Sequence, residues 1–302
     1  MGQPPFLSSG ALVGITCPSG YLAAERVAPM IEILEKWGFR VKCGQTVGTS
    51  DHYFSGTDDE RLADLQQMLD DPDIEAILMG RGGYGLSRII DRLNFSQFVH
   101  QPKWIGGFSD ITVLHNHIQA LYGIPTLHGP MSGHFKPGRE RDDSLLSLRK
   151  ALVGENLSYH TLPHEYNRHG QVSGILTGGN LALVAHLTGS ASEVDNTGKI
   201  LFLEDVGEYL YNIDRLMLHL KRAGKLKGLA GLIFGGFTDL KDTERPFGKT
   251  IDQILADVVK EYDYPVCFNF PAGHQDVNYA LTLGERHSFV VDQSGGKLEL
   301  RR

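Results

Sequence analysis

Ser109 is the residue of this sequence best placed to act as a nucleophile. It follows the short apolar run 104–107, which ends on two glycines, and it precedes a segment with helical periodicity. Two glycines allow the chain to turn sharply, and the first turn of the helix would direct its amides toward an oxyanion. The alternative is structural, because Ser109 or Asp110 at such a junction would cap the helix. Gly107-x-Ser109-x-Ile111 has the first glycine of the nucleophile-elbow pattern, whereas Ile111 stands where the second is expected.

A serine nucleophile needs a histidine as base, and the base needs a carboxylate that orients it. His274 is the best candidate of the 13 histidines, because it follows an apolar run and a proline-glycine turn. A loop histidine without chemistry is the alternative. Glu204 ends the apolar run 200–203, where its carboxylate would project from the edge of a sheet. Asp205 and Glu208 compete with Glu204 for the role of the orienting acid.

A glycine-rich loop, Gly80-Arg81-Gly82-Gly83-Tyr84-Gly85, directly follows the apolar run 74–79. Open α/β sheets place their ligand sites at such junctions between strand and loop. The planar guanidinium of Arg81 is suited to bidentate pairing with a substrate carboxylate, and a structural ion pair is the alternative. The loop matches neither the P-loop nor the dinucleotide-binding pattern, which makes a non-catalytic nucleotide- or sugar-binding protein the weaker alternative.

Strands and helices alternate over the first 135 residues or so, and this alternation predicts an α/β domain with a flavodoxin-like or Rossmann-like open parallel sheet. Thr57 and Glu60 form a capping box that opens a helix, and Asp71-Pro72 ends it. The predicted strands are 11–16, 39–43, 74–79, 104–107 and 124–127.

The second half has its own core pattern, with several strands and two amphipathic helices, and predicts a smaller, β-rich α+β or barrel-like domain. The domain boundaries predicted are 1–140 for the flavodoxin-like domain that carries the nucleophile, 141–170 for a polar linker, and 171–302 for the domain that carries Glu204 and His274.

Composition narrows the classes of partner. The chain of 302 residues has a net charge of -7, and a protein without a dense cationic face is not expected to bind nucleic acid or an anionic membrane. Cys17, Cys43 and Cys267 are odd in number and far apart, which argues against a disulfide framework. Cys17 is expected to be a buried structural thiol rather than a nucleophile. No signal peptide and no apolar run of about 18 residues is found, so we expect a cytoplasmic protein.

Four motifs together resemble the LD-carboxypeptidase family of serine peptidases, which also includes the microcin C immunity peptidases. They are the glycine loop 80–85, the segment 107–112, the segment 202–208 and Gly273-His274, in this order and in a chain of this length. One departure is the run 275–278, Gln-Asp-Val-Asn, where a run rich in glycine and asparagine is expected. This departure puts the local geometry of the histidine loop in question.

The resemblance implies a catalytic triad of Ser109, Glu204 and His274 in a cleft between two domains. It implies an oxyanion hole made by the backbone amides of Gly83 and Asp110. Arg81 and Tyr84 of the glycine loop are the predicted substrate contacts.

The activity implied by the resemblance is hydrolysis of an L,D peptide bond, which releases the terminal D-alanine of murein tetrapeptide during cell-wall recycling. A microcin-immunity-type peptidase that cleaves peptidyl or aminoacyl nucleotide conjugates is the alternative within the family. No metal and no cofactor is expected, and the family suggests a homodimer.

Overall fold

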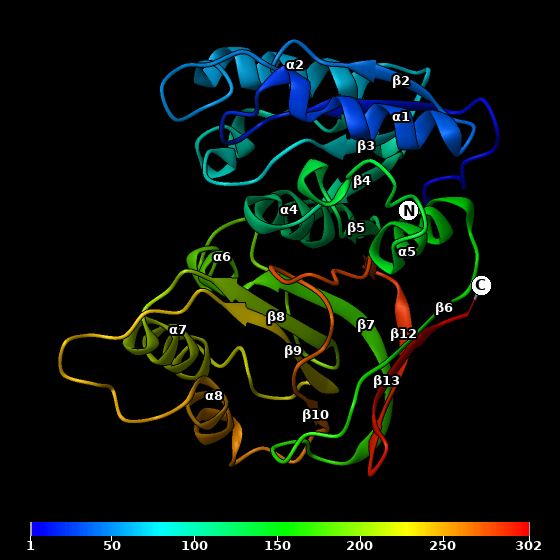
Figure 1. Cartoon of the computed structure of the whole chain (residues 1–302). Helices are drawn as coiled ribbons and strands as arrows, with labels where there is room; N and C mark the ends of the chain where they lie inside the picture. Colours follow the sequence, from blue (N-terminus) through cyan, green and yellow to red (C-terminus); the bar gives the residue numbers. More distant parts are fainter. Residues whose placement is uncertain (1, 302) are drawn as a thin grey trace. The chain divides into compact units, whose positions relative to one another are not determined.

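The computed structural model describes residues 2–301 and divides into two compact units (Figure 1). The first unit contains the residues up to Glu155 together with Tyr279–Thr282, and the second contains Asn156–Asn278 and the residues from Leu283 onward. Among the described residues, no helix is both long enough and apolar enough to cross a membrane.

The first unit is built on a sheet of six strands in the order β11-β5-β4-β3-β1-β2. Strand β1 pairs in parallel with β2 and β3, β3 pairs in parallel with β4, and β4 with β5. The order 2-1-3-4-5 is that of flavodoxin, so the predicted fold class is confirmed for this unit. The strands are β1 (Leu12–Thr16), β2 (Arg40–Cys43), β3 (Ile74–Met79), β4 (Trp104–Gly107), β5 (Thr126–His128) and β11 (Leu281–Leu283).

Helices connect these strands, and their ends follow from local sequence. The hydroxyl of Thr57 accepts a hydrogen bond from the amide of Glu60, and the Glu60 carboxylate accepts one from the Thr57 amide, as the capping box predicts. The α-helices are α1 (Ala28–Lys36), α2 (Asp58–Asp70), α3 (Ser96–His100), α4 (Thr112–Tyr122) and α5 (Asp143–Val153). The 3-10 helices are η1 (Ala24–Arg26), η2 (Leu86–Arg88), η3 (Ile90–Arg92), η4 (Ser109–Ile111) and η5 (Ser132–His134).

The second unit is built on a sheet of seven strands in the order β10-β9-β8-β7-β12-β13-β6. Strands β7 to β10 are parallel, whereas β12, β13 and β6 extend the sheet in antiparallel fashion. The strands are β6 (Leu157–His160), β7 (Gly170–Asn180), β8 (Ile200–Val206), β9 (Gly231–Thr238), β10 (Val266–Cys267), β12 (Arg286–Asp292) and β13 (Gly295–Leu300).

Each of the parallel strands β7, β8 and β9 is followed in the chain by a helix. These helices are α6 (Leu181–His186), α7 (Leu210–Arg222) and α8 (Ile251–Val259). Ile213 and Met217 of α7 and Leu255 of α8 share one buried cluster with Leu201 and Leu203 of β8. This core covers the strand that carries Glu204 and fixes its position within the unit.

Two segments differ from the predicted domain organisation. Helix α5 lies in the predicted linker 141–170 but belongs to the first unit, because its buried face joins that core and the Ser147 hydroxyl accepts a hydrogen bond from the Ala280 amide. The run 280–283 fits a strand of the second domain by pattern, yet β11 joins the sheet of the first unit. The pattern of a three-residue strand cannot indicate which sheet it joins.

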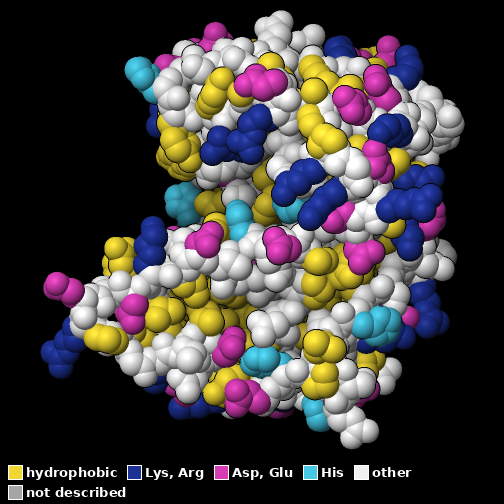
Figure 2. Space-filling model, in the orientation of Figure 1, with side chains coloured by type: hydrophobic (Ala, Val, Ile, Leu, Met, Phe, Trp, Pro, Cys, Tyr) yellow, Lys and Arg dark blue, Asp and Glu magenta, His cyan; other side chains and the backbone are white. Residues whose placement is uncertain are grey.

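Charged side chains of both signs are interspersed on the face of the molecule shown in Figure 2. Basic side chains form small groups there, and acidic side chains lie among them.

Candidate active site

Ser109 lies where β4 ends and the chain turns into η4 and then α4. Its φ of 65° places it in the left-handed region, which non-glycine residues rarely adopt and which recurs at functional sites. The serine of a nucleophile elbow is held on a similarly strained turn between strand and helix. The backbone therefore supports a catalytic role for Ser109 better than its sequence position alone.

The expectation that Ser109 or Asp110 caps the following helix is wrong. No side chain provides a capping hydrogen bond at the start of η4 or α4. The Asp110 carboxylate is buried and turns elsewhere: its Oδ2 accepts hydrogen bonds from the Ser19 hydroxyl at 2.6 Å and from the Leu86 amide at 2.9 Å. Asp110 thus joins the serine turn to two neighbouring loops.

Ile111, which stands where the second elbow glycine is expected, packs against Gly107. A Cβ atom on Gly107 would lie 2.9 Å from Cγ1 of Ile111 and 3.1 Å from Cβ of Met79. Ile111 fills the space that a side chain at position 107 would occupy. The turn therefore needs its first glycine and accommodates a branched residue in place of the second.

Gly82 of the glycine loop packs directly on the serine turn. A Cβ atom at this position would lie 2.9 Å from Cβ of Ser109, 3.1 Å from its Oγ and 3.3 Å from the amide nitrogen of Asp110. Only glycine allows this approach. The glycine loop therefore packs directly against the turn that carries Ser109.

Gly83 follows with a φ of 103°, and a Cβ atom there would lie 3.0 Å from the hydroxyl of Tyr53. Tyr53 comes from a distant loop and is 53% exposed, so this ring beside the glycine loop is a candidate substrate contact that sequence reasoning missed. Arg81 is exposed and donates a hydrogen bond from Nη1 to the Tyr21 carbonyl at 2.5 Å. Tyr84 is 46% exposed, with its ring 6.0 Å from that of Phe54.

In the second unit, Glu204 and His274 form a hydrogen-bonded pair. Oε2 of Glu204 lies 2.7 Å from Nδ1 of His274 and also accepts the backbone amide of His274 at 3.1 Å. Glu204 is fully buried, and 20% of the His274 side chain is exposed. A carboxylate on Nδ1 fixes the imidazole tautomer and leaves Nε2 as the nitrogen that can accept a proton.

The loop that carries His274 is held by several hydrogen bonds. Gly273 has a φ of 101°, and a Cβ atom on it would lie 2.6 Å from Oε2 of Glu204, so no side chain fits between the loop and the acid. The Gln275 side-chain amide donates to the carbonyls of Phe270 and Ala272, and the Asn278 side chain accepts the Gly273 amide at 2.8 Å. The unusual run 275–278 therefore contributes hydrogen bonds that hold the loop.

The two competing acids have other partners. Asp205 is buried and accepts hydrogen bonds from the Asn180 side chain and the amides of Ala182 and Val206, which places it at the start of α6. Burial raises the pKa of Asp205 to about 6. Glu208 accepts a hydrogen bond from the Asn212 side chain. Of the three acids, Glu204 is the one that is hydrogen-bonded to the His274 ring.

Cys17 is a buried free thiol, as expected. Burial raises its pKa to about 12, so the thiol stays protonated at neutral pH and lacks the thiolate that a nucleophile needs.

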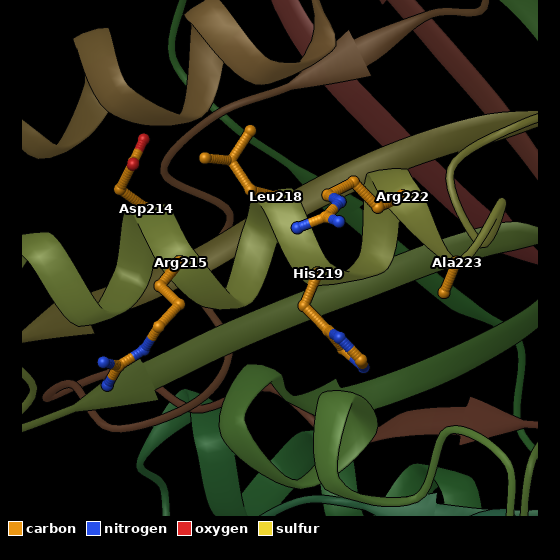
Figure 3. Close-up of a pocket in the computed structure, with 6 residues that line it drawn as sticks. All are labelled: Asp214, Arg215, Leu218, His219, Arg222 and Ala223. Atoms are coloured by element: carbon orange, nitrogen blue, oxygen red, sulfur yellow. The ribbon is translucent and has the colours of Figure 1, made fainter.

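A hollow of about 610 Å³ lies along one face of α7 (Figure 3). None of the predicted site residues is among those that line it. The lining residues are Asp214, Arg215, Leu218, His219, Arg222 and Ala223.

The candidate residues thus form two groups. Ser109, Asp110, Arg81, Gly83 and Tyr84 come together at the carboxyl ends of β3 and β4 in the first unit. Glu204 and His274 come together at the end of β8 in the second.

Comparison with known proteins identifies the family to which both units belong. Residues 13–129 match the LD-carboxypeptidase N-terminal domain, and residues 173–289 match the LD-carboxypeptidase C-terminal domain. A probable murein peptide carboxypeptidase of Bacillus subtilis is 33% identical over 98% of this chain and 94% of its own. The microcin C7 self-immunity protein of Escherichia coli is 27% identical over 95% of this chain and 94% of its own.

A solved structure leads to the same family. The muramoyltetrapeptide carboxypeptidase of Oxalobacter formigenes aligns with a TM-score of 0.86 and 26% identity, over 96% of this chain and 99% of its own. Both domains of the family are present here in their order and over most of the chain. This protein belongs to the LD-carboxypeptidase family.

Proposed function

We propose that this protein is a serine carboxypeptidase that hydrolyses an L,D peptide bond and releases the terminal D-alanine of murein tetrapeptide. The observation that carries the proposal is the 2.7 Å contact between buried Glu204 and Nδ1 of His274, in a chain whose Ser109 is held on a strained turn. Family membership and the names of the relatives from Bacillus and Oxalobacter support the substrate class.

The proposed triad works by proton transfer between its members. Nε2 of His274 takes the proton of the Ser109 hydroxyl as the serine oxygen attacks the carbonyl carbon of the scissile bond. Glu204 keeps Nδ1 protonated and stabilises the imidazolium that forms. His274 then gives the proton to the leaving D-alanine amine, and water hydrolyses the acyl-enzyme by the same route.

The backbone amides of Gly83 and Asp110 are the proposed oxyanion hole. The close packing of Gly82 on Ser109 supports this assignment, because it brings the glycine loop within van der Waals distance of the nucleophile. Arg81 and Tyr84, on the same loop, are the proposed substrate contacts. A guanidinium suits the terminal carboxylate that a carboxypeptidase substrate must present.

We also propose that the enzyme acts in the cytoplasm as a homodimer without a metal ion. The free cysteines Cys17, Cys43 and Cys267 fit a reducing compartment. The dimer rests on the family resemblance, and analytical ultracentrifugation of the purified protein tests it: a single species of 33.3 kDa would contradict it.

The test of function is release of free D-alanine from purified murein tetrapeptide. We expect release by the wild type, loss of at least a thousandfold in kcat for Ser109→Ala, and no change after treatment with EDTA. Release that survives Ser109→Ala would contradict the serine mechanism, and release abolished by EDTA would indicate a metal enzyme.

The microcin-immunity-type activity is the second candidate, favoured by the similarity to the microcin C7 protein and by the exposed rings of Tyr53 and Tyr84 beside the glycine loop. Aromatic rings of this kind can stack on a nucleobase. An aminoacyl sulfamoyl adenosine, with release of its amino acid measured, decides between the two: a higher kcat/KM for this conjugate than for tetrapeptide favours the second activity. No turnover of either compound would favour a non-catalytic binding protein.

A further inference from the structure

The peptide bond between Gly85 and Leu86 is held from both sides by buried groups of opposite charge. Its carbonyl, on Gly85, accepts a hydrogen bond from Nη1 of Arg61 at 3.2 Å. Its amide, on Leu86, donates to Oδ2 of Asp110 at 2.9 Å. This peptide bond closes the glycine loop 80–85, so Arg61 and Asp110 together fix the end of that loop.

The loop after β1 is held by the same two side chains. The Pro18 carbonyl accepts a hydrogen bond from Nη1 of Arg61 at 2.6 Å, and the hydroxyl of Ser19 donates to Oδ2 of Asp110 at 2.6 Å. The two loops also meet directly, because the Gly20 amide donates to the Gly82 carbonyl at 3.0 Å. Arg61 and Asp110 therefore join two loops and the serine turn into one hydrogen-bonded unit.

Burial sets Arg61 apart from an ordinary surface arginine. Its side chain is fully buried, donates from Nε to the Gly56 carbonyl, pairs with Asp58 and lies 4.7 Å from the ring centre of Phe54. Removing a guanidinium from water costs several kcal/mol unless its donors are satisfied. Here backbone carbonyls of three separate loop segments supply much of that compensation, so the side chain determines where those segments lie.

Gly85 shows how closely the loop fits this arginine. A Cβ atom at position 85 would lie 2.7 Å from Nη1 of Arg61 and 3.1 Å from Cα of Ser19. The loop has no room to shift toward the arginine, and the hydrogen bonds keep it from moving away.

We propose that Arg61 is a positioning residue that, together with the Asp110 carboxylate, sets the distance between the glycine loop and the Ser109 turn. The inference rests on the proposed function, because that distance matters when the amides of Gly83 and Asp110 bind an oxyanion. Arg61 itself need not touch substrate. A misplacement of about 1 Å in such a site can cost a hundredfold in rate.

Arg88 provides a matched control within the same cluster. It also pairs with Asp58 and also lies near the ring of Phe54, at 5.7 Å, but 47% of its side chain is exposed. Its guanidinium binds Asp58 and interacts with the side chain of Tyr84. Only its backbone amide, which a lysine keeps, donates to the Gly85 carbonyl. Arg61→Lys and Arg88→Lys therefore make the same chemical change, with and without the loss of side-chain hydrogen bonds to backbone carbonyls of the loops.

The experiment compares both variants with the wild type in release of D-alanine from murein tetrapeptide. A lysine at position 61 keeps the charge, but its single ammonium group cannot reach all the backbone carbonyls that the guanidinium of Arg61 binds. We expect kcat to fall 10- to 100-fold in Arg61→Lys with KM within about threefold, and kcat of Arg88→Lys to stay within twofold of the wild type. Ser19→Ala, which removes one hydrogen bond to Asp110, should lower kcat about threefold to tenfold and supplies the test if Arg61→Lys does not fold.

A second readout separates this inference from the choice of substrate. A fluorophosphonate forms a bond from phosphorus to Oγ of Ser109 while fluoride leaves and the hydroxyl proton passes to His274, and its phosphoryl oxygen occupies the oxyanion hole. The rate of this labelling should fall in Arg61→Lys by about the same factor as kcat. If the wild type labels but releases no D-alanine, the proposed substrate is wrong and the labelling rates still test Arg61.

Three results would overturn the role of Arg61. They are a folded Arg61→Lys enzyme with wild-type kcat and labelling rate, an equal loss in both arginine variants, and an effect confined to KM. If Arg61→Lys does not fold, wild-type kcat and labelling in Ser19→Ala would overturn the proposal.

Discussion

Two hydrogen bonds to one oxygen define the relation between Glu204 and His274. Oε2 of Glu204 binds both the amide and Nδ1 of His274, so the carboxylate holds the backbone and the ring of the same residue. The orientation of the imidazole thus depends on the loop as well as on the side chain. The acid is fully buried, which makes the interaction stronger than the same pair would be in water.

Glu204→Gln should reduce kcat by at least a hundredfold, because an amide at this position no longer favours the tautomer with a proton on Nδ1. Glu208→Gln is the matched control, and its kcat should stay within threefold, since Glu208 binds Asn212 instead of His274. Steady-state release of D-alanine measures both. A large loss in Glu208→Gln alone would mean that the orienting acid has been misassigned.

The sequence predicted the candidate serine, histidine and acid region but left three acids open. Glu204 and Asp205 are neighbours on one strand, and successive side chains of a strand point to opposite faces, so only the placement of His274 could separate them. Tyr53, Arg61 and Ser19 carry no local signal of function. Each acts on the glycine loop or the serine turn through a tertiary contact, and spacing in the chain does not reveal such contacts.

At the scale of elements, the serine turn and the glycine loop are the ends of adjacent parallel strands. Parallel strands β3 and β4 finish at the same edge of the sheet, and this topology alone brings the two segments together. This part of the site was predictable from the order of strands. The tight fit between the segments was not, because it depends on the absence of single Cβ atoms.

Gly82→Ala should lower both activity and stability, because the new methyl group would lie 2.9 Å from Cβ of Ser109. Overpacking of this kind costs about 1–3 kcal/mol, and the displaced turn should lower kcat at least tenfold. The control is Gly133→Ala in η5, where a Cβ atom meets nothing within 4 Å. Thermal unfolding and D-alanine release check the pair, and equal behaviour of the two variants would refute the steric argument.

Most elements of the first sheet were predictable, since its strands are short apolar runs between clear helix signals. Strand β11 was assigned to the other domain because Leu281–Leu283 has the pattern of a strand but its partner is set by tertiary structure. Helix α5 was assigned to a linker because the polar run before it resembles one. The polar run instead contains Asp142, whose carboxylate accepts the Ser144 amide and caps that helix.

At the scale of the whole molecule, the two units allow stability to be followed separately. Both tryptophans of the chain, Trp37 and Trp104, lie in the first unit, so their fluorescence reports its unfolding. Within that unit, His115 of α4 is fully buried, and its Nε2 lies 2.8 Å from the Gly107 carbonyl. Burial lowers the pKa of His115 to about 4.

The first unit should lose stability in acid because of His115. Above pH 6.5 the histidine is neutral in both states; as the pH falls from 6.5 toward 4, only the unfolded state takes up the proton, so the free energy of unfolding decreases. The loss amounts to about 3 kcal/mol by pH 4. In His115→Leu this contribution should be missing, while the exposed His100→Leu should behave as the wild type.

Urea unfolding followed by tryptophan fluorescence at pH 7 and pH 4.5 measures this difference. The Gly107 carbonyl also accepts the Gly129 amide, so it keeps one donor in the variant. A wild-type pH dependence in His115→Leu would show that other groups cause the acid sensitivity.

The return of the chain to the first unit at Tyr279–Thr282 bears on how the protein is synthesised. On the ribosome, the sheet that carries Ser109 is missing its edge strand β11 until about 280 residues have been made, and β5 has an unpaired edge meanwhile. At about 5–20 residues per second, His274 and β11 leave the ribosome within a second or so of each other. A messenger that stopped just before Tyr279 would encode every candidate catalytic residue and still not complete the sheet of the nucleophile.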